Sequence, residues 1–294
     1  MRTLKYIVET MRPKQWVKNF FVFASLLFSG HFFMIRDSLP VILVFFCFCA
    51  ASSAVYTFND IMDREKDRRH AVKCNRPLAA GRLSIRTAAT ASASLAVIAG
   101  IILLRLGNPK VALIVLMYLA LNVLYSSFLK RKVIVDAFCV ALGFELRVWA
   151  GSLVMDMHPS AWLQVCTFLI ALFLSFGKRR EELIKLKDDA VDHRHVLAKY
   201  TVPFIDQLIT VSGVVAILAY TLYTLSPEIA LRTRGMLIYT VPFAMYGIFR
   251  YLYLVSVKEK GGDPGEVLMK DLPMFLDLAC WFGGVLFIIY VRGR

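Results

Sequence analysis

The sequence predicts an all-α integral membrane protein, built as a bundle of about nine transmembrane helices. Of its 294 residues, 58% are hydrophobic and 19% are charged, whereas soluble domains average about 45–50% apolar and about 25% charged residues. The apolar residues gather in runs of roughly 20, the length that crosses the hydrocarbon core as a helix. These runs do not alternate apolar and polar residues, which argues against a membrane-spanning barrel.

Nine runs are long and apolar enough to be spans, and some of them contain charges. Lys18 lies near the start of the first run. The fifth contains Asp136, Glu145 and Arg147, and the ninth contains Asp277. A charge in lipid is costly, so we expect these side chains to face partners or a polar cavity. The runs are residues 16–35, 38–58, 85–105, 109–128, 133–155, 160–177, 204–225, 235–256 and 272–291.

The basic residues indicate the orientation. Lys and Arg number 35 against 21 Asp and Glu, a net charge of +14. With the N-terminus placed inside, 27 basic residues fall in inner segments and 7 in outer ones, and Arg147 lies within a span. This positive-inside asymmetry predicts a multi-pass protein of the inner (cytoplasmic) membrane, N-in and C-out. Because topology accounts for most of the positive charge, we expect no nucleic-acid partner.

Three inner loops are long and contain charges of both signs, while the outer loops are short. The long loops are residues 59–84, 178–202 and 257–271. A connection needs neither this length nor this composition, but an anion-handling active site would use both. We therefore expect a single transmembrane catalytic domain, residues 1–294, whose active site faces the cytoplasm and is capped by these loops.

Residues 59–67 read N-D-x-x-D-x-x-x-D and begin where the second run ends. Residues three and four apart share a helix face, so Asp60, Asp63 and Asp67 would line one side. Carboxylates that close repel one another unless a cation lies among them, and hard oxygen ligands suit Mg²⁺ bound with substrate phosphates. The motif predicts a magnesium site, with Asn59 nearby. The alternative is a solvated acidic patch paired with Arg64, Lys66, Arg68 and Arg69.

A basic segment follows the aspartates directly. Lys73, Arg76 and Arg82 lie in or beside N-R-P-L-A-A-G, residues 75–81. An arginine can grip phosphate oxygens through two parallel N–H groups, so cations beside metal-binding carboxylates suit a diphosphate. Anchoring at the membrane surface explains basic residues anywhere in the loop, but it does not explain this patterned segment.

The aspartate motif, a short basic linker and N-R-P-L-A-A-G, at the end of the second of about nine spans, resemble the UbiA superfamily of intramembrane prenyltransferases. The resemblance covers essentially the whole chain. It implies a UbiA-like helical bundle with Mg²⁺ as its cofactor. The first motif is fairly specific for the superfamily and says little about the acceptor.

Four further segments are similar to one branch of this superfamily, the decaprenyl-phosphate phosphoribosyltransferases. The resemblance implies Mg²⁺-dependent transfer of 5-phosphoribose from phosphoribosyl diphosphate (PRPP) to a polyprenyl phosphate of the decaprenyl type. The products would be diphosphate and polyprenylphosphoryl-5-phosphoribose. The segments are R-P-x-Q-W-x-K-N at 12–19, Y-S-S-F-L-K at 125–130, G-F-E-L-R-V-W-A-G at 143–151 and G-K-R-x-x-E-L at 177–183.

The same resemblance implies roles by position. The catalytic residues would be Asp60, Asp63, Asp67, Arg147 and Lys178, and the metal ligands would be the three aspartates with Asn59. The substrate-binding residues would be Arg12, Lys18, Asn59, Lys73, Arg76, Tyr125, Lys130, Arg147, Lys178, Arg179 and Glu182. The assignment of cations to ribose 5-phosphate or lipid phosphate stays open, as does the choice between one and two metal ions. The partners would be PRPP, polyprenyl phosphate and membrane lipid, and a homo-oligomer is left open.

Two other functions stay open. Asp188 and Asp192 have the D-x-x-x-D spacing of a second metal motif, which most UbiA-type prenyltransferases carry in this loop. They would suit transfer of a prenyl group from a prenyl diphosphate to an aromatic or glycerol-phosphate acceptor. The three consecutive cations at 178–180 favour an anion cradle instead. A non-enzymatic transporter or lipid-binding protein is the other alternative, but transport sites usually lie near the bilayer midplane.

Overall fold

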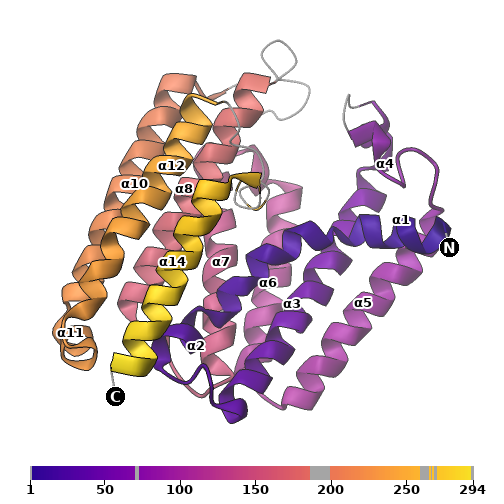
Figure 1. Cartoon of the computed structure of the whole chain (residues 1–294). Helices are drawn as coiled ribbons and strands as arrows, with labels where there is room; N and C mark the ends of the chain where they lie inside the picture. Colours follow the sequence, from indigo (N-terminus) through magenta and orange to yellow (C-terminus); the bar gives the residue numbers. More distant parts are fainter. Residues whose placement is uncertain are drawn as a thin grey trace. The chain divides into compact units, whose positions relative to one another are not determined.

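Helices account for all the regular structure that the computed structural model describes (Figure 1). The described residues are 2–69, 73–185, 199–258, 265, 267 and 270–292, and no strand occurs among them. The chain divides into two compact units, each made of segments that are separate in sequence. The first unit comprises residues 1–26, 32–128 and 146–158, and the second comprises 27–31, 129–145 and 159–294.

The first unit is organised around the long helix α3 (Ile35–Met62), against which α1, η1, α5 and α6 all pack. Its apolar core includes Phe48 of α3, whose ring meets the edge of Tyr118. The other elements of this unit are α1 (Arg2–Met11), the 3₁₀ helix η1 (Pro13–Phe23), α4 (Arg64–Arg68), η2 (Lys73–Asn75), α5 (Ile85–Leu106) and α6 (Pro109–Ser127).

Local sequence signals set the ends of α5 and α6. Ser84 caps α5 by accepting a hydrogen bond from the backbone N–H of Thr87. Gly107, with a positive φ of 61°, ends the helix in the left-handed conformation that glycine adopts without penalty. Asn108 then caps α6, and Pro109 occupies its first turn, where a missing N–H has no consequence. The two helices are therefore joined by a short, well-specified turn.

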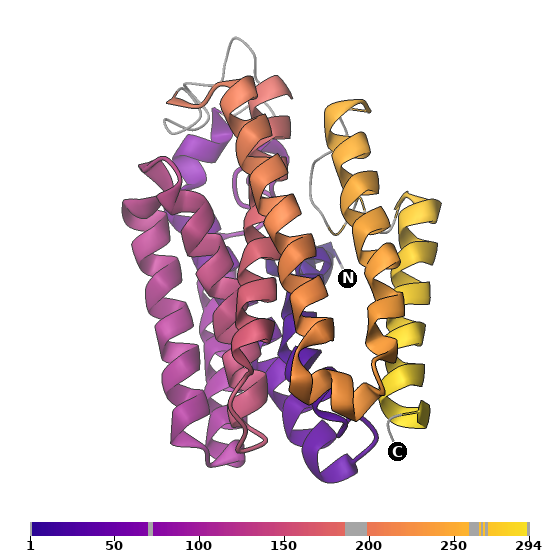
Figure 2. The same cartoon turned by 90° about the vertical axis from the view of Figure 1, so that its left-hand side faces the viewer.

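The second unit is a set of packed long helices. α8 (Ala161–Lys185) packs on α10 (Val202–Leu225), and α12 (Val241–Ser256) packs on α10 and on α14 (Leu272–Phe287). Figure 2 shows α10 and α12 side by side and joined at one end. The remaining elements are η3 (Leu129–Arg131), α11 (Pro227–Thr233), η5 (Met236–Thr240) and η6 (Ile288–Arg292). Two helices contribute residues to both units, namely α2 (Ala24–Ser29) and α7 (Val135–Leu153).

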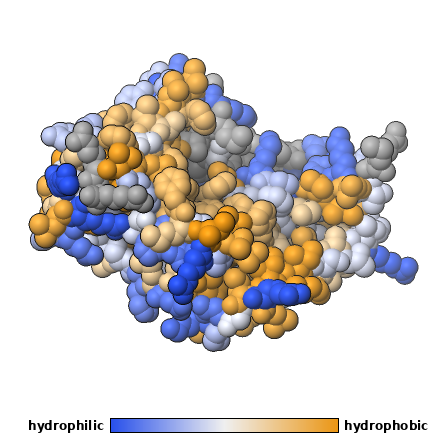
Figure 3. Space-filling view, turned by 60° about the horizontal axis from the view of Figure 1, so that its bottom comes forward, coloured by the Kyte–Doolittle hydropathy of each residue, from blue (hydrophilic) through white to orange (hydrophobic). Residues whose placement is uncertain are grey.

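Seven helical segments in the described part are long and apolar enough to cross a membrane, and each coincides with one of the nine predicted runs. The first predicted run forms η1 and α2 instead, and the fifth forms α7. Apolar side chains on the outside of these helices fit a lipid-facing surface: Val97, Ile101 and Leu104 share one exposed face of α5. Figure 3 shows hydrophobic side chains exposed over the face that it presents.

The first predicted run follows α3 closely because polar side chains tie it there. Arg12 leaves α1 in the left-handed conformation, with φ 54°, and Pro13 begins η1. Trp16 donates its indole N–H to the Ser53 hydroxyl at 3.0 Å, and the Asn19 amide lies 3.3 Å from the Cys49 sulfur. The segment R-P-x-Q-W-x-K-N therefore holds η1 against α3, and it also contains cations predicted to bind substrate.

Gly151 of α7 allows the backbone of η1 to approach closely. A Cβ built at this position would lie only 1.9 Å from the carbonyl oxygen of Val22. A backbone atom cannot rotate away as a flexible side chain can, so only glycine fits here. The motif G-F-E-L-R-V-W-A-G therefore ends with a residue that packing requires.

We expect Gly151→Ala to destabilise the protein by about 1–3 kcal/mol, because the added methyl group must push two helices apart. The measurement is the unfolding midpoint of the purified protein in detergent. Gly100→Ala is the matched control, since a Cβ at that helical glycine of α5 meets no atom within 4 Å. Equal midpoints for the two variants would contradict the close approach.

Candidate active site

The aspartate motif lies where α3 gives way to α4. α3 ends at Met62 and α4 begins at Arg64, so Asp63 sits at the junction, with φ −90° and ψ 5°. The expected single helical face is therefore wrong in detail. Asp60 and Asp67 are buried, with exposed fractions of 3% and 4%, whereas Asp63 is half-buried. Asp63 therefore lies at the break between the helices that carry Asp60 and Asp67, and it is the most exposed of the three.

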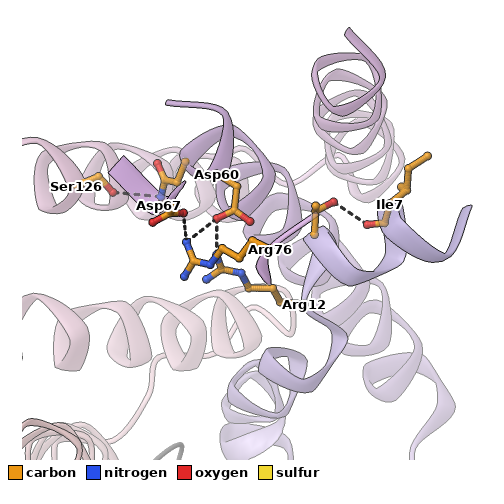
Figure 4. A network of polar contacts seen from close by, with 8 residues as sticks. Ile7, Arg12, Asp60, Asp67, Arg76 and Ser126 are labelled. Carbon is orange, nitrogen blue, oxygen red and sulfur yellow. Dashed lines mark hydrogen bonds and ion pairs between the residues drawn. The ribbon is translucent and has the colours of Figure 1, made fainter. Parts of the chain in front are cut away.

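Two arginines join the buried aspartates (Figure 4). Arg76 donates through one nitrogen, Nη1, both to Asp60 Oδ1 at 3.0 Å and to Asp67 Oδ2 at 2.6 Å. Arg12 Nη2 lies 2.5 Å from the same Asp60 oxygen, and its guanidinium also lies over the Tyr56 ring. Charge-assisted bonds of this kind offset the cost of burying two carboxylates.

The segment N-R-P-L-A-A-G places Arg76 by folding back onto α4. Leu78 is buried in a small apolar cluster that also includes Leu83. The carbonyl oxygen of Leu78 accepts from Arg64 Nε at 3.3 Å, and that of Ala79 accepts from Arg68 Nε at 3.2 Å. Arg64 and Arg68 therefore hold the loop, and both also pair with Glu65 of the same motif, as the alternative of a self-paired acidic patch expects in part.

Asn59 connects the aspartate motif to the segment Y-S-S at the end of α6. Its amide nitrogen donates to the Ser126 hydroxyl at 3.2 Å, as the dashed line in Figure 4 marks. Tyr125, the predicted substrate-binding residue, is the neighbour of Ser126 and is half-buried. Two motifs that are far apart in sequence thus meet at the end of α3.

The donor set fits a divalent cation, although in the described residues no three His, Cys, Asp or Glu side chains gather closely enough to form a metal-binding group by themselves. Asp60 Oδ1 and Asp67 Oδ2 both lie within 3.0 Å of one cationic nitrogen of Arg76. Two hard oxygens that converge on one positive charge are what Mg²⁺ takes from a protein when phosphates and water supply its other ligands.

Arg147 lies deep inside the first unit, with an exposed fraction of 5%. Its Nε donates to Asn19 Oδ1 at 2.8 Å, and its Nη2 donates to the Tyr118 hydroxyl at 3.0 Å. The guanidinium also lies over the rings of Phe48 and Tyr118. Arg147 therefore contacts other helices, as predicted from the sequence, and its hydrogen bonds link α7 to η1 and to α6.

In the second unit, Arg179 of α8 is engaged by two carboxylates. Its Nε donates to Asp136 Oδ2 at 2.6 Å and its Nη1 to Glu182 Oε2 at 3.0 Å. Tyr200 donates to the other oxygen of Asp136 at 3.2 Å and accepts from the backbone N–H of Ile134. Burial raises the pKa of Tyr200 to about 12, so the hydroxyl keeps its proton near neutral pH.

Arg180, the next residue along α8, is paired as well. It donates to Asp206 Oδ1 at 2.5 Å and to the carbonyl oxygen of Val255 at 2.8 Å. Two of the three consecutive cations expected to form an anion cradle are thus already neutralised within their own unit. A phosphate that bound Arg179 would compete with Asp136 and Glu182.

The remaining predicted site residues are half-buried: Lys18, Lys73, Lys130 and Lys178. Lys18 donates to the side chain of Gln15 at 2.5 Å. Asp188 and Asp192, the candidates for a second metal motif, lie outside the described residues.

The structure adds partners that the sequence did not single out. Asn19 and Ser126 lie within two of the motifs quoted from the sequence, so their position in these motifs could have identified them as site residues. Asp136 was expected to need a partner because it lies in an apolar run, but no feature of the sequence named Arg179 or Tyr200 as that partner.

Comparison with known proteins supplies close parallels in sequence and in fold. The decaprenyl-phosphate phosphoribosyltransferase of Corynebacterium glutamicum is 30% identical over 290 residues, covering 97% of this chain and 87% of that protein. The protein of the same name from Mycolicibacterium smegmatis is 29% identical and covers 97% of this chain and 92% of its own length. A UbiA homolog from Archaeoglobus fulgidus, solved with GPP and Mg²⁺, has a TM-score of 0.71 at 17% identity, covering 97% of this chain and 100% of that chain.

The family assignment follows from the extent of the match. The model of the UbiA prenyltransferase family matches residues 19–276, which is most of the chain, and the likeness in fold extends over nearly all of it. The aspartate motif and N-R-P-L-A-A-G, on which the prediction of this family rested, both lie within the matched region. The chain is a multi-pass membrane protein that belongs to the UbiA prenyltransferase family.

Proposed function

We propose that this enzyme is a polyprenyl-phosphate phosphoribosyltransferase. It transfers 5-phosphoribose from PRPP to a decaprenyl-type polyprenyl phosphate, with Mg²⁺ as cofactor, and releases diphosphate. The observation that carries the proposal is the pair of buried carboxylates, Asp60 and Asp67, held between Arg12 and Arg76. Relatives named for this activity at about 30% identity over nearly the whole chain support the choice of donor.

Asp60 and Asp67 would hold the metal, and Asn59 and Asp63 are the further proposed ligands. When bound, Mg²⁺ would neutralise the negative charge that grows on the leaving diphosphate. One or two ions are compatible with this donor set.

Arg12 and Arg76 would bind oxygens of the donor diphosphate. Both guanidinium groups lie beside the aspartates and are partly exposed, so they can meet a ligand that enters from solvent. As the C1–O bond of PRPP breaks, its electron pair leaves with the diphosphate. An oxygen of the polyprenyl phosphate then forms the new bond to C1 from the opposite face, with inversion. That oxygen is already anionic, so no side chain has to remove a proton.

The other phosphates need cations of their own. Lys18 and Lys73 are proposed to help bind the donor, PRPP, and Tyr125 is proposed to contact its ribose. Lys130, Arg147, Lys178 and Arg179 are proposed to hold the ribose 5-phosphate and the lipid phosphate between them, and Glu182 to bind a ribose hydroxyl or orient Arg179. Arg147 and Arg179 already donate hydrogen bonds to side chains of the protein. To bind a phosphate, they would have to share or give up these bonds.

The proposed setting is a single catalytic domain of about nine spans in the inner membrane, N-in and C-out. Loops 59–84, 178–202 and 257–271 would cap an active site that faces the cytoplasm. This orientation places the aspartate cluster on the side where a soluble donor such as PRPP is available. It also keeps most of the basic residues on that side.

The test is release of diphosphate by the purified full-length protein with Mg²⁺ and one of two substrate pairs. We expect release with PRPP and a polyprenyl phosphate, and none with a prenyl diphosphate and 4-hydroxybenzoate. The reverse result would contradict the proposal and favour a prenyltransferase. Asp192→Ala sharpens the distinction, because it should only weaken phosphoribosyl transfer but should abolish transfer of a prenyl group.

A further inference from the structure

The two carboxylate oxygens that converge on one point are the ones that the arginines occupy. Asp60 Oδ1 accepts from both Arg12 and Arg76, and Asp67 Oδ2 accepts from Arg76. The nitrogen Nη1 of Arg76 lies between the two aspartates, within 3.0 Å of one oxygen from each. In the described part of the chain, these two aspartates are the side-chain partners of Arg76.

A divalent cation and Arg76 cannot occupy this position together. Mg²⁺ binds oxygen at about 2.0–2.1 Å, and a guanidinium nitrogen already within hydrogen-bond distance of both oxygens leaves no room for it. Two positive charges at one point would also repel. The metal can therefore bridge Asp60 Oδ1 and Asp67 Oδ2 only when Arg76 withdraws.

Arg76 is placed to withdraw and to find a new partner. Its side chain is 29% exposed and that of Arg12 is 30% exposed, while the two aspartates are almost fully buried. The carboxylates are therefore fixed and the guanidinium groups are the movable members of the cluster. A diphosphate offers them several anionic oxygens in a geometry that arginine binds bidentately.

We propose that Arg76, assisted by Arg12, is a built-in counter-ion that keeps the aspartates neutralised until the donor arrives, and that then exchanges onto the diphosphate. The inference rests on the proposed function in that the aspartates bind the metal and the arginines bind a diphosphate. The exchange couples the binding of metal and diphosphate. A metal ion that binds alone must displace Arg76, which then has no anionic partner. When metal and diphosphate bind together, the metal pairs with the aspartates and Arg76 pairs with the diphosphate. Each ligand therefore raises the affinity for the other.

The experiment measures Mn²⁺ binding to the purified full-length protein by the EPR signal of the free ion, with and without inorganic diphosphate. In the unmodified protein we expect diphosphate to raise Mn²⁺ affinity about tenfold beyond its effect on Mn²⁺ in buffer, which is a typical coupling between two sites. Arg76→Gln should bind Mn²⁺ about tenfold more tightly without diphosphate and should lose most of the coupling. Arg76→Lys keeps the positive charge and should restore weak binding of the metal alone.

Lys66→Gln is the matched control, because it removes an exposed positive charge next to Asp67 in α4 without removing a bond to the two aspartates or to the loop that carries Arg76. An equal gain in Mn²⁺ affinity in Lys66→Gln and Arg76→Gln would overturn the exchange, because general electrostatics would then explain it. Unchanged or weaker binding in Arg76→Gln would also overturn it while leaving the metal site intact. If neither the unmodified protein nor any variant binds Mn²⁺ in the presence of diphosphate, the proposed metal site is wrong as well.

Discussion

Replacing Asp60 with asparagine is expected to lower the rate of diphosphate release by about 10²–10³-fold, the usual loss when one group that stabilises developing charge is removed. Asparagine keeps the size and one acceptor oxygen but removes the negative charge. The change leaves Arg12 and Arg76 with one carboxylate fewer to neutralise them. It also replaces one of the two buried carboxylates proposed to bind the metal with a neutral amide. The measurement is the rate at saturating Mg²⁺ and donor.

Asp37→Asn is the control, because Asp37 lies in the first turn of the same helix, α3, at the end away from the cluster. Its rate should stay within about twofold of the unmodified protein, as for most substitutions away from a site. Asp67→Asn should resemble Asp60→Asn, since both aspartates accept from the same nitrogen of Arg76. An Asp60→Asn variant with more than half the original rate would rule out the cluster as the active site.

The sequence indicates which residues belong to this cluster, but its geometry could not be predicted. The spacing of Asp60, Asp63 and Asp67 indicates a shared helix face only while the helix continues, and α3 ends one residue before Asp63. Spacing also cannot show that Arg76 returns to the aspartates, because that contact depends on the fold of the loop around Leu78. Local patterns identify the participating groups, whereas tertiary packing decides which of them meet.

A similar division holds for the fold. Seven long apolar runs are helices with the predicted placement, because the length and hydropathy of a span are properties of the local sequence. Residues 16–35 fail to form one uninterrupted α-helix because Trp16 and Asn19 bond to α3 and Gly151 admits the backbone at Val22. These contacts come from residues that are distant in sequence, and apolar content alone does not reveal them.

The largest effect on stability is expected at Asp136, whose side chain is fully buried against Arg179. Asp136→Asn should lower the free energy of unfolding by about 3–5 kcal/mol, because it leaves a buried guanidinium without its carboxylate. Glu65→Gln is the control: Glu65 pairs with Arg68, and their side chains are 71% and 42% exposed. An exposed pair contributes at most about 1 kcal/mol, so this variant should unfold close to the unmodified protein. The measurement is the denaturation midpoint in detergent.

The double variant Asp136→Asn with Arg179→Gln separates two roles for Arg179. If the pair serves mainly to hold the helices, removing both charges should recover part of the stability that either single change loses, because no buried charge is left unpaired. If Arg179 also binds a substrate phosphate, the double variant should regain stability but keep a raised KM for PRPP or for the lipid phosphate. Recovery of both stability and KM would assign Arg179 to the fold alone and leave phosphate binding to the lysines. A double variant no more stable than the singles would show that Tyr200 and Glu182, which also bond to this pair, depend on both charges.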